Sequence, residues 1–356
     1  ASQEIRRPSV DYVISGFGEQ TFPGWIDIMA RGELSHLREV PGLHYKENGV
    51  IRFNPPAEIP AVLDELPFPD RKLIDLDEYY TLADRSRMAT MYSSRGCPYR
   101  CIFCDVAEKR FHYRTADSIV DEFQELIALG IEEIHIFDDT FNVIRERVIQ
   151  MCREIFRRNI KVRWSSRARV NPCDREMLAL MKEAGCVRLH VGVESLEPEV
   201  LTAIKKKQDL RQIQDFFRWC SELAIETVAF FILGFPGETE EYRKNFYRKV
   251  RELNPSYLYV NILQPLYHTE YYNNLLQEGV WENDPWKDFV ENPVPAFKLP
   301  PFRPPRKERE LISLVNRIHR RFYLSPRFII SDLIRDSSAR MLLRKAKAAG
   351  RLIRAG

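Results

Sequence analysis

Three cysteines, Cys97, Cys101 and Cys104, lie within one short loop in the spacing C-x3-C-x2-C. Three thiolates can hold three irons of a 4Fe-4S cluster, whereas the usual electron-transfer cluster takes four cysteines. The loop therefore predicts a cluster in which one iron stays open to another ligand. The turn residues Gly96 and Pro98 favour a tight loop in which the thiols converge.

Two other interpretations of these cysteines stay open. A structural zinc site takes four ligands, and the nearest histidine, His112, has no second partner at a ligand spacing. A disulfide within the loop would leave one odd thiol, and the cysteines could also be unligated. Ligand-count rules favour the three-cysteine cluster.

The elements that must position the loop alternate along the chain. From Met88 to about Gln264, short apolar strands alternate with helical stretches, which is typical of a parallel sheet with crossover helices. The expected strands span residues 89–92, 133–137, 162–168, 187–192, 227–233 and 257–262. The expected helices span residues 118–129, 145–158, 175–184, 198–205, 210–223 and 240–253. Six such units predict an open, partial barrel of the α/β class, in which the carboxyl ends of the strands carry the site.

Several further motifs accompany the cysteine loop in one order. They are Leu66-Pro67-Phe68-Pro69, Asp138-Asp139-Thr140-Phe141, Gly192-Val193-Glu194-Ser195, Gly234-Phe235-Pro236-Gly237-Glu238-Thr239 and, near the C-terminus, Arg321-Phe322-Tyr323-Leu324-Ser325-Pro326-Arg327. Together with Cys97-x3-Cys101-x-Phe103-Cys104 they resemble the radical S-adenosylmethionine (SAM) enzymes, in particular their large cobalamin-associated class. The resemblance covers about residues 60 to 265 and implies a partial (β/α)6 TIM-like barrel.

The resemblance also implies a reaction. An enzyme of this class cleaves SAM reductively at the 4Fe-4S cluster to a 5′-deoxyadenosyl radical, which abstracts hydrogen from an unactivated substrate carbon. Cobalamin-dependent C-methylation is favoured, and radical cyclase or oxidoreductase chemistry is the alternative. The implied partners are a small-molecule or lipid-like substrate and a one-electron reductant of the flavodoxin or ferredoxin type. From a different class, a metal-bearing nucleic-acid-binding module stays open.

The resemblance assigns several residues to SAM. A cationic amine needs acceptors, which Asp138, Asp139 and Thr140 could supply, although an Asp could instead cap the helix that begins near Ile144. Arg169 and Glu194 resemble ligands of the ribose or methionyl group. Lys206 resembles a partner for a carboxylate, and its neighbours Lys205 and Lys207 are expected to be solvated. At Gly234 the backbone could approach adenine or simply turn. The full expected set is Phe103, Asp138, Asp139, Thr140, Arg169, Glu194, Ser195, Lys206 and Gly234.

Residues outside the barrel suggest the domain organisation. An apolar strand at 10–14, Gly16-Phe17-Gly18-Glu19 and a helix near 21–30 resemble the end of a Rossmann-like cobalamin-binding domain, and Asn48-Gly49 predicts a hairpin. The cobalamin loop Asp-x-His-x-x-Gly is absent, so we expect a fragment that has lost most of that domain. The expected division is a domain remnant at 1–40, a linker at 41–85, the core at 86–265 and a substrate, lid and basic helical region at 266–356.

Composition indicates a cytoplasmic enzyme. The 356 residues are 44% hydrophobic and 29% charged, with no signal peptide or membrane-spanning run. From Arg303 onward, fifteen Lys or Arg face four Asp or Glu, a net of +11 in a chain of +3. That tail could hold nucleic acid or an anionic lipid surface, or be the solvated face of packing helices. Because no additional cluster cysteines precede Cys97, we do not expect a tRNA substrate. The scattered cysteines are expected to be buried thiols: Cys152, Cys173, Cys186 and Cys220.

Overall fold

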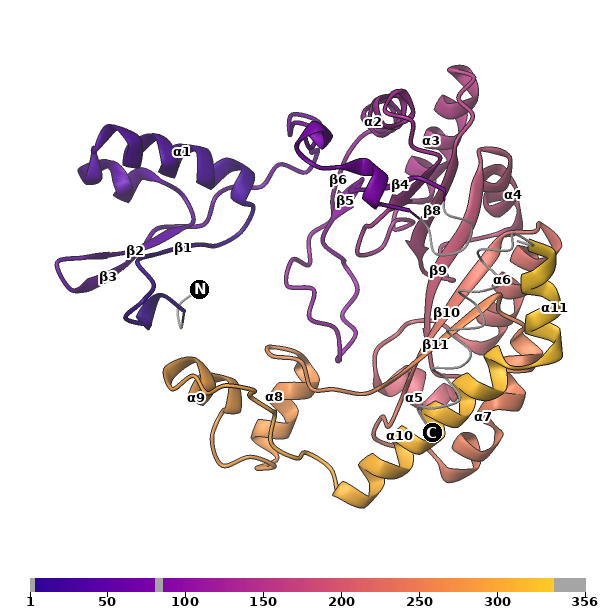
Figure 1. Ribbon diagram of the computed structural model, residues 1–356. Coiled ribbons are helices and arrows are strands. Elements are labelled where there is room, and N and C mark those ends of the chain that lie inside the picture. Colours follow the sequence, from indigo (N-terminus) through magenta and orange to yellow (C-terminus); the bar gives the residue numbers. More distant parts are fainter. Residues whose placement is uncertain (1–3, 81–85, 336–356) are drawn as a thin grey trace. The chain divides into compact units, whose positions relative to one another are not determined.

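The computed structural model describes residues 4–80 and 86–335 (Figure 1). The described residues form two compact units. One unit combines residues up to 61 with residues 270–302, and the other combines residues 62–269 with residues from 303 onward. The cysteine loop and every expected SAM residue belong to the second unit.

The second unit is built on a parallel sheet of six strands in the order β11-β10-β9-β8-β7-β4. The strands are β4 (Met88–Met91), β7 (Glu133–Ile136), β8 (Arg163–Ala168), β9 (Cys186–Glu194), β10 (Glu226–Leu233) and β11 (Tyr257–Ile262). The helices are α2 (Ala116–Ala128), α3 (Arg145–Arg157), α4 (Arg175–Glu183), α5 (Pro198–Ala203), α6 (Leu210–Glu222), α7 (Glu240–Leu253), α10 (Pro305–Tyr323) and α11 (Pro326–Arg335). All six predicted strand–helix alternations are confirmed, with ends shifted by only a few residues.

The core lies between the sheet and its helices. Alternate strand residues such as Ile134 and Ile136 are fully buried and meet the apolar stripes of the helices, where Phe123 and Phe216 are also fully buried. Of the scattered cysteines, Cys152, Cys186 and Cys220 are buried and Cys173 is half-buried. The expectation of core thiols is therefore largely confirmed.

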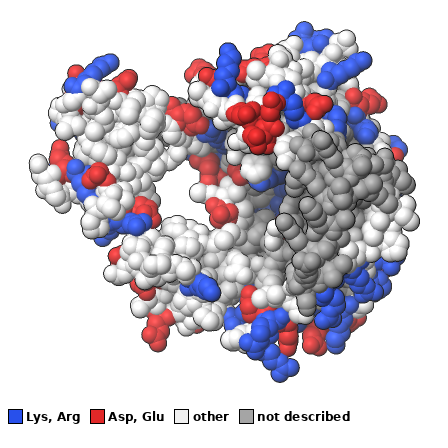
Figure 2. All heavy atoms as spheres, in the orientation of Figure 1, with Lys and Arg blue, Asp and Glu red and all other residues white. Residues whose placement is uncertain are grey.

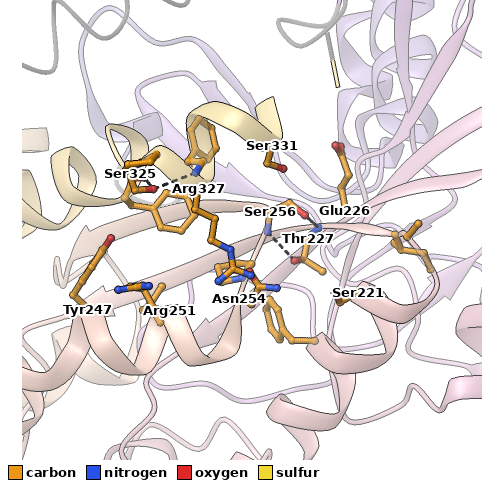
Figure 3. A pocket seen from close by; sticks show the side chains of 18 residues that line it. Ser221, Glu226, Thr227, Tyr247, Arg251, Asn254, Ser256, Ser325, Arg327 and Ser331 are labelled. Carbon is orange, nitrogen blue, oxygen red and sulfur yellow. Dashed lines mark hydrogen bonds between the residues drawn. The ribbon is translucent and has the colours of Figure 1, made fainter. Parts of the chain in front are cut away.

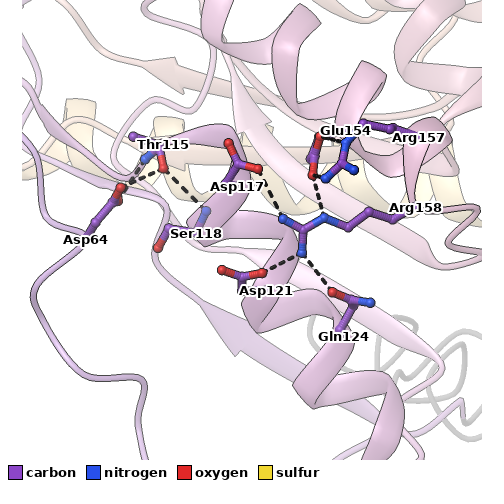
Figure 4. Close-up of polar contacts among 9 residues, drawn as sticks. All are labelled: Asp64, Thr115, Asp117, Ser118, Asp121, Gln124, Glu154, Arg157 and Arg158. Carbon is purple, nitrogen blue, oxygen red and sulfur yellow. Dashed lines mark hydrogen bonds and ion pairs between the residues drawn. The ribbon is translucent and has the colours of Figure 1, made fainter.

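Helices α2 and α3 are joined by polar contacts around Arg158 (Figure 4). Its guanidinium donates to Asp121 at 2.5 Å and to Gln124 at 2.8 Å, both on α2. Asp64 accepts from the N–H of Thr115 at 2.9 Å and from its hydroxyl at 2.6 Å, while Thr115 caps α2. The segment before the barrel is thus fastened to the first helix of the barrel.

Charged residues fill the inner face near the amino ends of the strands. Glu133, the first residue of β7, lies 3.1 Å from both Arg188 and Arg163, and Arg188 lies 2.8 Å from Glu226, the first residue of β10. These ion pairs join four neighbouring strands, β7 to β10. The inner face at this end is therefore occupied by side chains that are already paired.

The edge strand β11 is covered by α10. The hydroxyl of Tyr323 accepts from the N–H of Leu258 at 3.2 Å and donates to its carbonyl at 2.7 Å. His319 Nε2 accepts from the N–H of Val260 at 3.1 Å. Side chains of α10 thus occupy backbone groups that an exposed edge would leave open to another strand.

The first unit contains an antiparallel sheet in the order β1-β2-β3, formed by β1 (Tyr12–Ile14), β2 (Leu43–Glu47) and β3 (Val50–Phe53). Its helices are α1 (Gly18–Arg31), α8 (Glu270–Gln277) and α9 (Pro285–Glu291). Asn48 and Gly49 both have positive φ, at 50° and 78°, which confirms the predicted hairpin. A Rossmann-like domain would have parallel strands, and the described strands of this unit pair antiparallel.

Shorter elements complete the described chain: β5 (Ser94–Arg95), β6 (His112–Tyr113) and the 3-10 turns Glu4–Arg6, Leu34–Glu39, Arg71–Leu73 and Leu76–Glu78. Among the described helices, none has the length and apolar character needed to cross a bilayer. The basic residues after Arg335 lie outside the described part of the chain.

Candidate active site

The cysteine loop connects β5 to β6 and folds back on itself. The N–H of Cys97 donates to the carbonyl of Glu108 at 3.0 Å, and that of Cys104 donates to the carbonyl of Cys101 at 3.2 Å. Gly96 has a φ of +80°, and a Cβ there would lie 2.1 Å from the Arg110 carbonyl oxygen. Only glycine satisfies both conditions, so the residue before the first cysteine is fixed by the turn.

The three thiols lie close enough to affect one another electrostatically. Burial raises the pKa of the Cys104 thiol most, and the neighbouring Cys101 and Cys97 raise it further, against the lowering effect of Lys109. In residues 4–80 and 86–335, no three or more His, Cys, Asp or Glu side chains are grouped as a single metal ion would require. The donors present are three sulfur atoms on one loop, a set that suits an iron–sulfur cluster.

Asp138 holds the chain that leads into this loop. Its Oδ1 accepts from the N–H groups of Ser93 at 2.7 Å and Ser94 at 2.9 Å, and its Oδ2 accepts from their hydroxyls at 2.5 and 2.6 Å. Arg147 of α3 lies 3.7 Å from the same carboxylate, and both side chains are buried. The carboxylate therefore has its partners within the protein.

Asp139 and Thr140 lie beside the loop itself. Asp139 is exposed and accepts from the N–H of Gly96 at 3.1 Å, while the hydroxyl of Thr140 lies 3.4 Å from Cys97 Sγ. The N-cap residue of α3 is Ile144, whose side chain makes no capping hydrogen bond. The alternative that an Asp of this motif caps the helix is therefore wrong.

Glu194 and Lys206 form a buried ion pair at the carboxyl end of β9. Their Oε1 and Nζ atoms lie 2.8 Å apart, and the side chains are 9% and 7% exposed. A register shift between β9 and β10 precedes Glu194, whose φ is +67°, an uncommon conformation for a residue with a side chain. A Cβ at Gly192 would lie 2.4 Å from Glu194 Oε1 and 2.8 Å from Lys206 Nζ, so the pair occupies the space above this glycine.

Sequence reasoning selects Lys206, and not Lys205 or Lys207, as the partner of a carboxylate. Burial agrees with this choice, because Lys206 is buried and both neighbours are exposed. The backbone around these lysines touches the cysteine loop. The carbonyl of Lys205 lies 3.9 Å from Cys101 Sγ, and the N–H of Ile102 donates to the carbonyl of Ile204 at 3.2 Å. The segment after α5 thus supports the cysteine loop and carries the buried cation.

Arg169 joins the end of β8 to both features. Its Nη1 lies 3.8 Å from Cys101 Sγ, its guanidinium lies 3.8 Å from the centre of the Tyr99 ring, and its Nη2 donates to the Lys206 carbonyl. Asn142 accepts from the Arg169 N–H at 2.9 Å and donates to its carbonyl at 2.8 Å. Tyr99 and Asn142 are neighbours of the site that the motifs did not single out, although Tyr99 lies between two of the cysteines.

Phe103, Gly234 and Ser195 make contacts with the turns and the helix around the loop. The ring centres of Phe103 and Phe235 are 5.5 Å apart, which puts the cysteine loop against the turn after β10. Gly234 has a φ of +93°, and a Cβ there would lie 2.9 Å from Leu311 of α10. Ser195 is buried, and its hydroxyl accepts from the N–H of Glu197 at 3.1 Å, within its own turn.

Between the ion pairs and the cysteine loop, rings line the inner face of the sheet. Six residues, here called the ring strip, have successive ring centres 6.0, 5.5, 4.9, 6.1 and 5.5 Å apart: Tyr92, Phe137, His135, His190, Phe230 and Tyr259. They come from, or directly follow, strands β4, β7, β9, β10 and β11. The guanidinium of Arg167 lies 3.7 Å from the centre of the Phe137 ring.

The two histidines of the ring strip are neutral at pH 7. The pKa of His135 is lowered to about 4 and that of His190 to about 3, mainly by burial and in smaller part by the charges of Arg167 and Arg188 and, for His190, by His135. The outer rings of the strip are accessible, since Tyr92 is 50% and Tyr259 is 51% exposed. The strip is therefore an uncharged aromatic surface, and Arg167 lies against its Phe137 ring.

A cavity of about 770 Å³ lies at the opposite end of the sheet (Figure 3). It is lined by Glu226 and Thr227 at the start of β10, by Ser256 just before β11 and by Arg327 of α11. This cavity lies at the amino ends of β10 and β11, whereas the cysteine loop lies at the carboxyl ends of the strands. The candidate active site is therefore assigned to the carboxyl edge alone.

Comparison with known proteins agrees with this geometry. Residues 91–250, from the end of β4 to α7, match the radical SAM superfamily. This region, 160 of the 356 residues, belongs to the radical SAM superfamily. An uncharacterized methyltransferase of Pyrococcus horikoshii is 29% identical over 330 residues, which are 92% of this chain and 70% of that protein.

Two further proteins show how far the likeness extends. The anaerobic magnesium-protoporphyrin IX monomethyl ester cyclase of Rubrivivax gelatinosus is 25% identical over 94% of this chain and 60% of its own length. The radical SAM methyltransferase TsrM of Kitasatospora setae, solved with tryptophan substrate and a SAM analogue, aligns over 75% of this chain and 54% of its own, with a TM-score of 0.66 and 23% identity. That likeness establishes the radical SAM type of fold, and the chain spans just over half of that enzyme.

Proposed function

We propose that this chain is the catalytic core of a radical SAM methyltransferase that modifies a carbon atom of a small-molecule or lipid-like substrate. The observation that carries the proposal is the meeting, at one edge of the parallel sheet, of three neighbouring thiols with a buried Glu194–Lys206 pair and with Arg169. A soft three-sulfur site beside groups that recognise an amino acid and a ribose is what a SAM-cleaving cluster needs.

Cys97, Cys101 and Cys104 would hold the cluster, which when bound supplies the electron that cleaves SAM. Lys206 and Arg169 supply the cations that a methionyl carboxylate requires, and Glu194 supplies an acceptor for ribose hydroxyls. The other residues assigned to SAM have different roles, which follow from their contacts.

Asp139 and Thr140 border Cys97 and offer acceptors to the SAM amino group. Asp138 already accepts four hydrogen bonds, so its contribution is to hold the chain before the loop. Phe103 and Gly234 shape the wall between the loop and the turn after β10. Ser195 braces the turn that follows Glu194.

The ring strip is the surface on which we expect the substrate to lie. Flat, uncharged side chains favour a substrate with an apolar or π-bonded face, and Arg167 at the edge of the strip suits an anionic substituent. A cyclase that acts on a similar planar face is the second candidate, supported by the likeness to the Rubrivivax enzyme, whose name describes cyclisation.

We propose cobalamin as a cofactor of the whole protein only because a protein of similar structure holds it. A structure of TsrM with a TM-score of 0.62 holds cobalamin and a [4Fe-4S] cluster. The sequence Asp-x-His-x-x-Gly is absent here, and the strands of the first unit are antiparallel. These residues do not fit a cobalamin site, so we propose residues 1–40 only as the end of such a domain and assign no step to cobalamin.

Anaerobic reconstitution with iron and sulfide tests the proposal. We expect about four irons per chain, and 5′-deoxyadenosine from SAM in the presence of dithionite. Cys97→Ala should lose both, whereas the matched variant Cys220→Ala, which changes a buried cysteine of α6 outside the loop, should keep both. A cluster-loaded protein that leaves SAM intact would refute the proposal.

A further inference from the structure

A groove runs between α7 and α10 on the outer side of the second unit. It has a volume of about 930 Å³ and is here called the basic groove. Seven cations and two acids line it: Arg243, Lys244, Arg306, Lys307, Arg309, Arg317 and Arg321, with Glu240 and Glu310. Figure 2 shows Lys and Arg side chains gathered over these two helices, at the lower right of the view.

The charges of the basic groove are unbalanced. The acid Glu240 lies 3.5 Å from Lys244 and Glu310 lies 2.9 Å from Arg306, in each case one turn along the same helix. The other five cations therefore exceed the acids of the groove. Such an excess of one sign in a concave surface focuses the field and attracts an oppositely charged partner.

The floor of the basic groove is apolar. Leu311 and Ile318 of α10 are each 2% exposed, and Leu314 lies between them. Among the lining residues, Tyr247 of α7 donates to the carbonyl of Arg321 at 2.8 Å, and the guanidinium of Arg321 lies 4.5 Å from the Tyr247 ring centre. The floor is thus covered by α10 itself, and the groove offers a partner mainly the cations of its rim.

The basic groove is connected to the cysteine loop by two packed contacts. Leu311, in its floor, is the side chain that a Cβ at Gly234 would meet at 2.9 Å. The next residue, Phe235, packs its ring 5.5 Å from that of Phe103, between the second and third cysteines. The same turn touches the rim, since Arg243 lies within 3.5 Å of the Glu238 carbonyl. The turn after β10 thus contacts both the basic groove and the cysteine loop.

We propose that the basic groove docks an acidic one-electron carrier protein, of the flavodoxin or ferredoxin type, that reduces the cluster. This inference rests on the proposed function, because only a reductively activated cluster needs such a partner. One electron leaves the carrier, which is oxidised by one electron, and enters the cluster held by the three cysteines. No other bond or atom changes in this step.

Charge and position together favour this partner. A lipid surface would require apolar side chains that project outward, and the large apolar residues of the basic groove form its buried floor. A single-stranded nucleic acid would favour aromatic stacking along a basic track, and the groove contains one aromatic ring, that of Tyr247, packed under Arg321. Weak, charge-steered docking is typical of electron-transfer complexes.

The test compares two reductants on the reconstituted full chain. The variant Arg309→Glu/Arg317→Glu changes two exposed rim residues, and the control Arg153→Glu/Arg211→Glu makes the same charge change on α3 and α6, where the side chains are 69% and 92% exposed. We measure deoxyadenosine formation with dithionite and with a bacterial flavodoxin kept reduced by its reductase. We also measure the Kd of oxidised flavodoxin by calorimetry, which needs no turnover.

The rim variant should weaken flavodoxin binding and flavodoxin-driven cleavage about tenfold, and leave dithionite-driven cleavage unchanged. The control variant should change none of these. Raising the salt concentration from about 50 to about 300 mM should weaken the wild type more than the rim variant.

Equal flavodoxin affinity in the wild type and the rim variant would overturn the proposal. An equal loss with both reductants would also overturn it, because the arginines would then act on the cluster. Tight binding of a short RNA or of anionic vesicles that only the rim variant loses, with flavodoxin binding unchanged, would assign the basic groove to that other partner. Failure of wild-type protein to cleave SAM even with dithionite would refute the proposed function instead, and the binding measurement would still decide whether the carrier docks.

Discussion

Replacing Asp138 by Asn should destabilise the protein although the shape of the side chain is kept. The carboxylate accepts two N–H and two O–H groups within 2.9 Å and lies 3.7 Å from Arg147, whose side chain is 4% exposed. The Asn oxygen can keep both backbone N–H groups, and the serine hydroxyls can turn to accept from its amide. What cannot be replaced is the negative charge beside the buried guanidinium.

The magnitude follows from Arg147. Burial lowers the pKa of Arg147 and the charge of Asp138 raises it, so the carboxylate offsets part of the cost of burying the cation. Removing one partner of a buried ion pair costs about 3–5 kcal/mol. Arg147 keeps its hydrogen bonds to the carbonyls of Ser93 and Phe141, at 3.1 and 2.7 Å, so we expect the low end, about 3 kcal/mol.

Urea unfolding of the metal-free protein measures this loss as a change in the free energy of unfolding. Asp139→Asn is the matched control, since Asp139 is exposed and accepts one N–H, that of Gly96; it should cost less than about 1 kcal/mol. The reconstituted Asp138→Asn protein should also hold less iron, because Ser93 and Ser94 lead directly into the cysteine loop. Equal stability of the two variants would refute the reasoning.

Three further outcomes are expected from the inner face. Glu194→Gln leaves Lys206 buried without its counter-charge and should weaken SAM binding in equilibrium dialysis, with a loss of about 3 kcal/mol of stability, and no change in either would contradict the assignment. Gly192→Ala places a methyl group 2.4 Å from Glu194 Oε1 and should weaken SAM binding similarly while leaving both charges present. Folding lowers the pKa of His135 to about 4 and that of His190 to about 3, whereas a histidine in the unfolded chain has a pKa of about 6.5. Below pH 6.5 the unfolded chain therefore binds more protons than the folded chain. The stabilisation is complete above that pH and falls as the pH drops, by about 2 kcal/mol per histidine at pH 5. His190→Gln should flatten that pH dependence in urea titrations, and an unchanged slope would show that His190 is not the source.

The alternation of strands and helices was predictable because most strands of the sheet are short apolar runs and the helices have one apolar face. Burial of Ile134 and Ile136 in β7 is the direct product of that pattern. The cysteine loop was equally accessible, since its chemistry depends on residue type and spacing within one turn. Lys206 could be chosen over its neighbours only through the resemblance, and the structure distinguishes it by burial.

Other features depend on contacts that leave no local mark in the sequence. Asp138 and Asp139 are identical side chains one residue apart, yet Asp138 accepts from the serines before the loop and Asp139 accepts from Gly96. The ring strip combines residues from five strands, and the stagger of those strands decides which rings become neighbours. The grouping of residues 270–302 with the first 61 is a long-range result of the same kind.

Helix α10 shows that a basic tail can be a packing element and a partner surface at the same time. Tyr323 and His319 face β11 and occupy its edge groups, while Leu311 and Ile318 are buried. These inward positions fix the rotation of the helix, and the arginines can then lie only on its outward side and toward α7. Solvation alone would be satisfied by charges of either sign. Seven cations against two acids around an apolar floor exceed what solvation requires, and that excess favours a partner with acidic side chains.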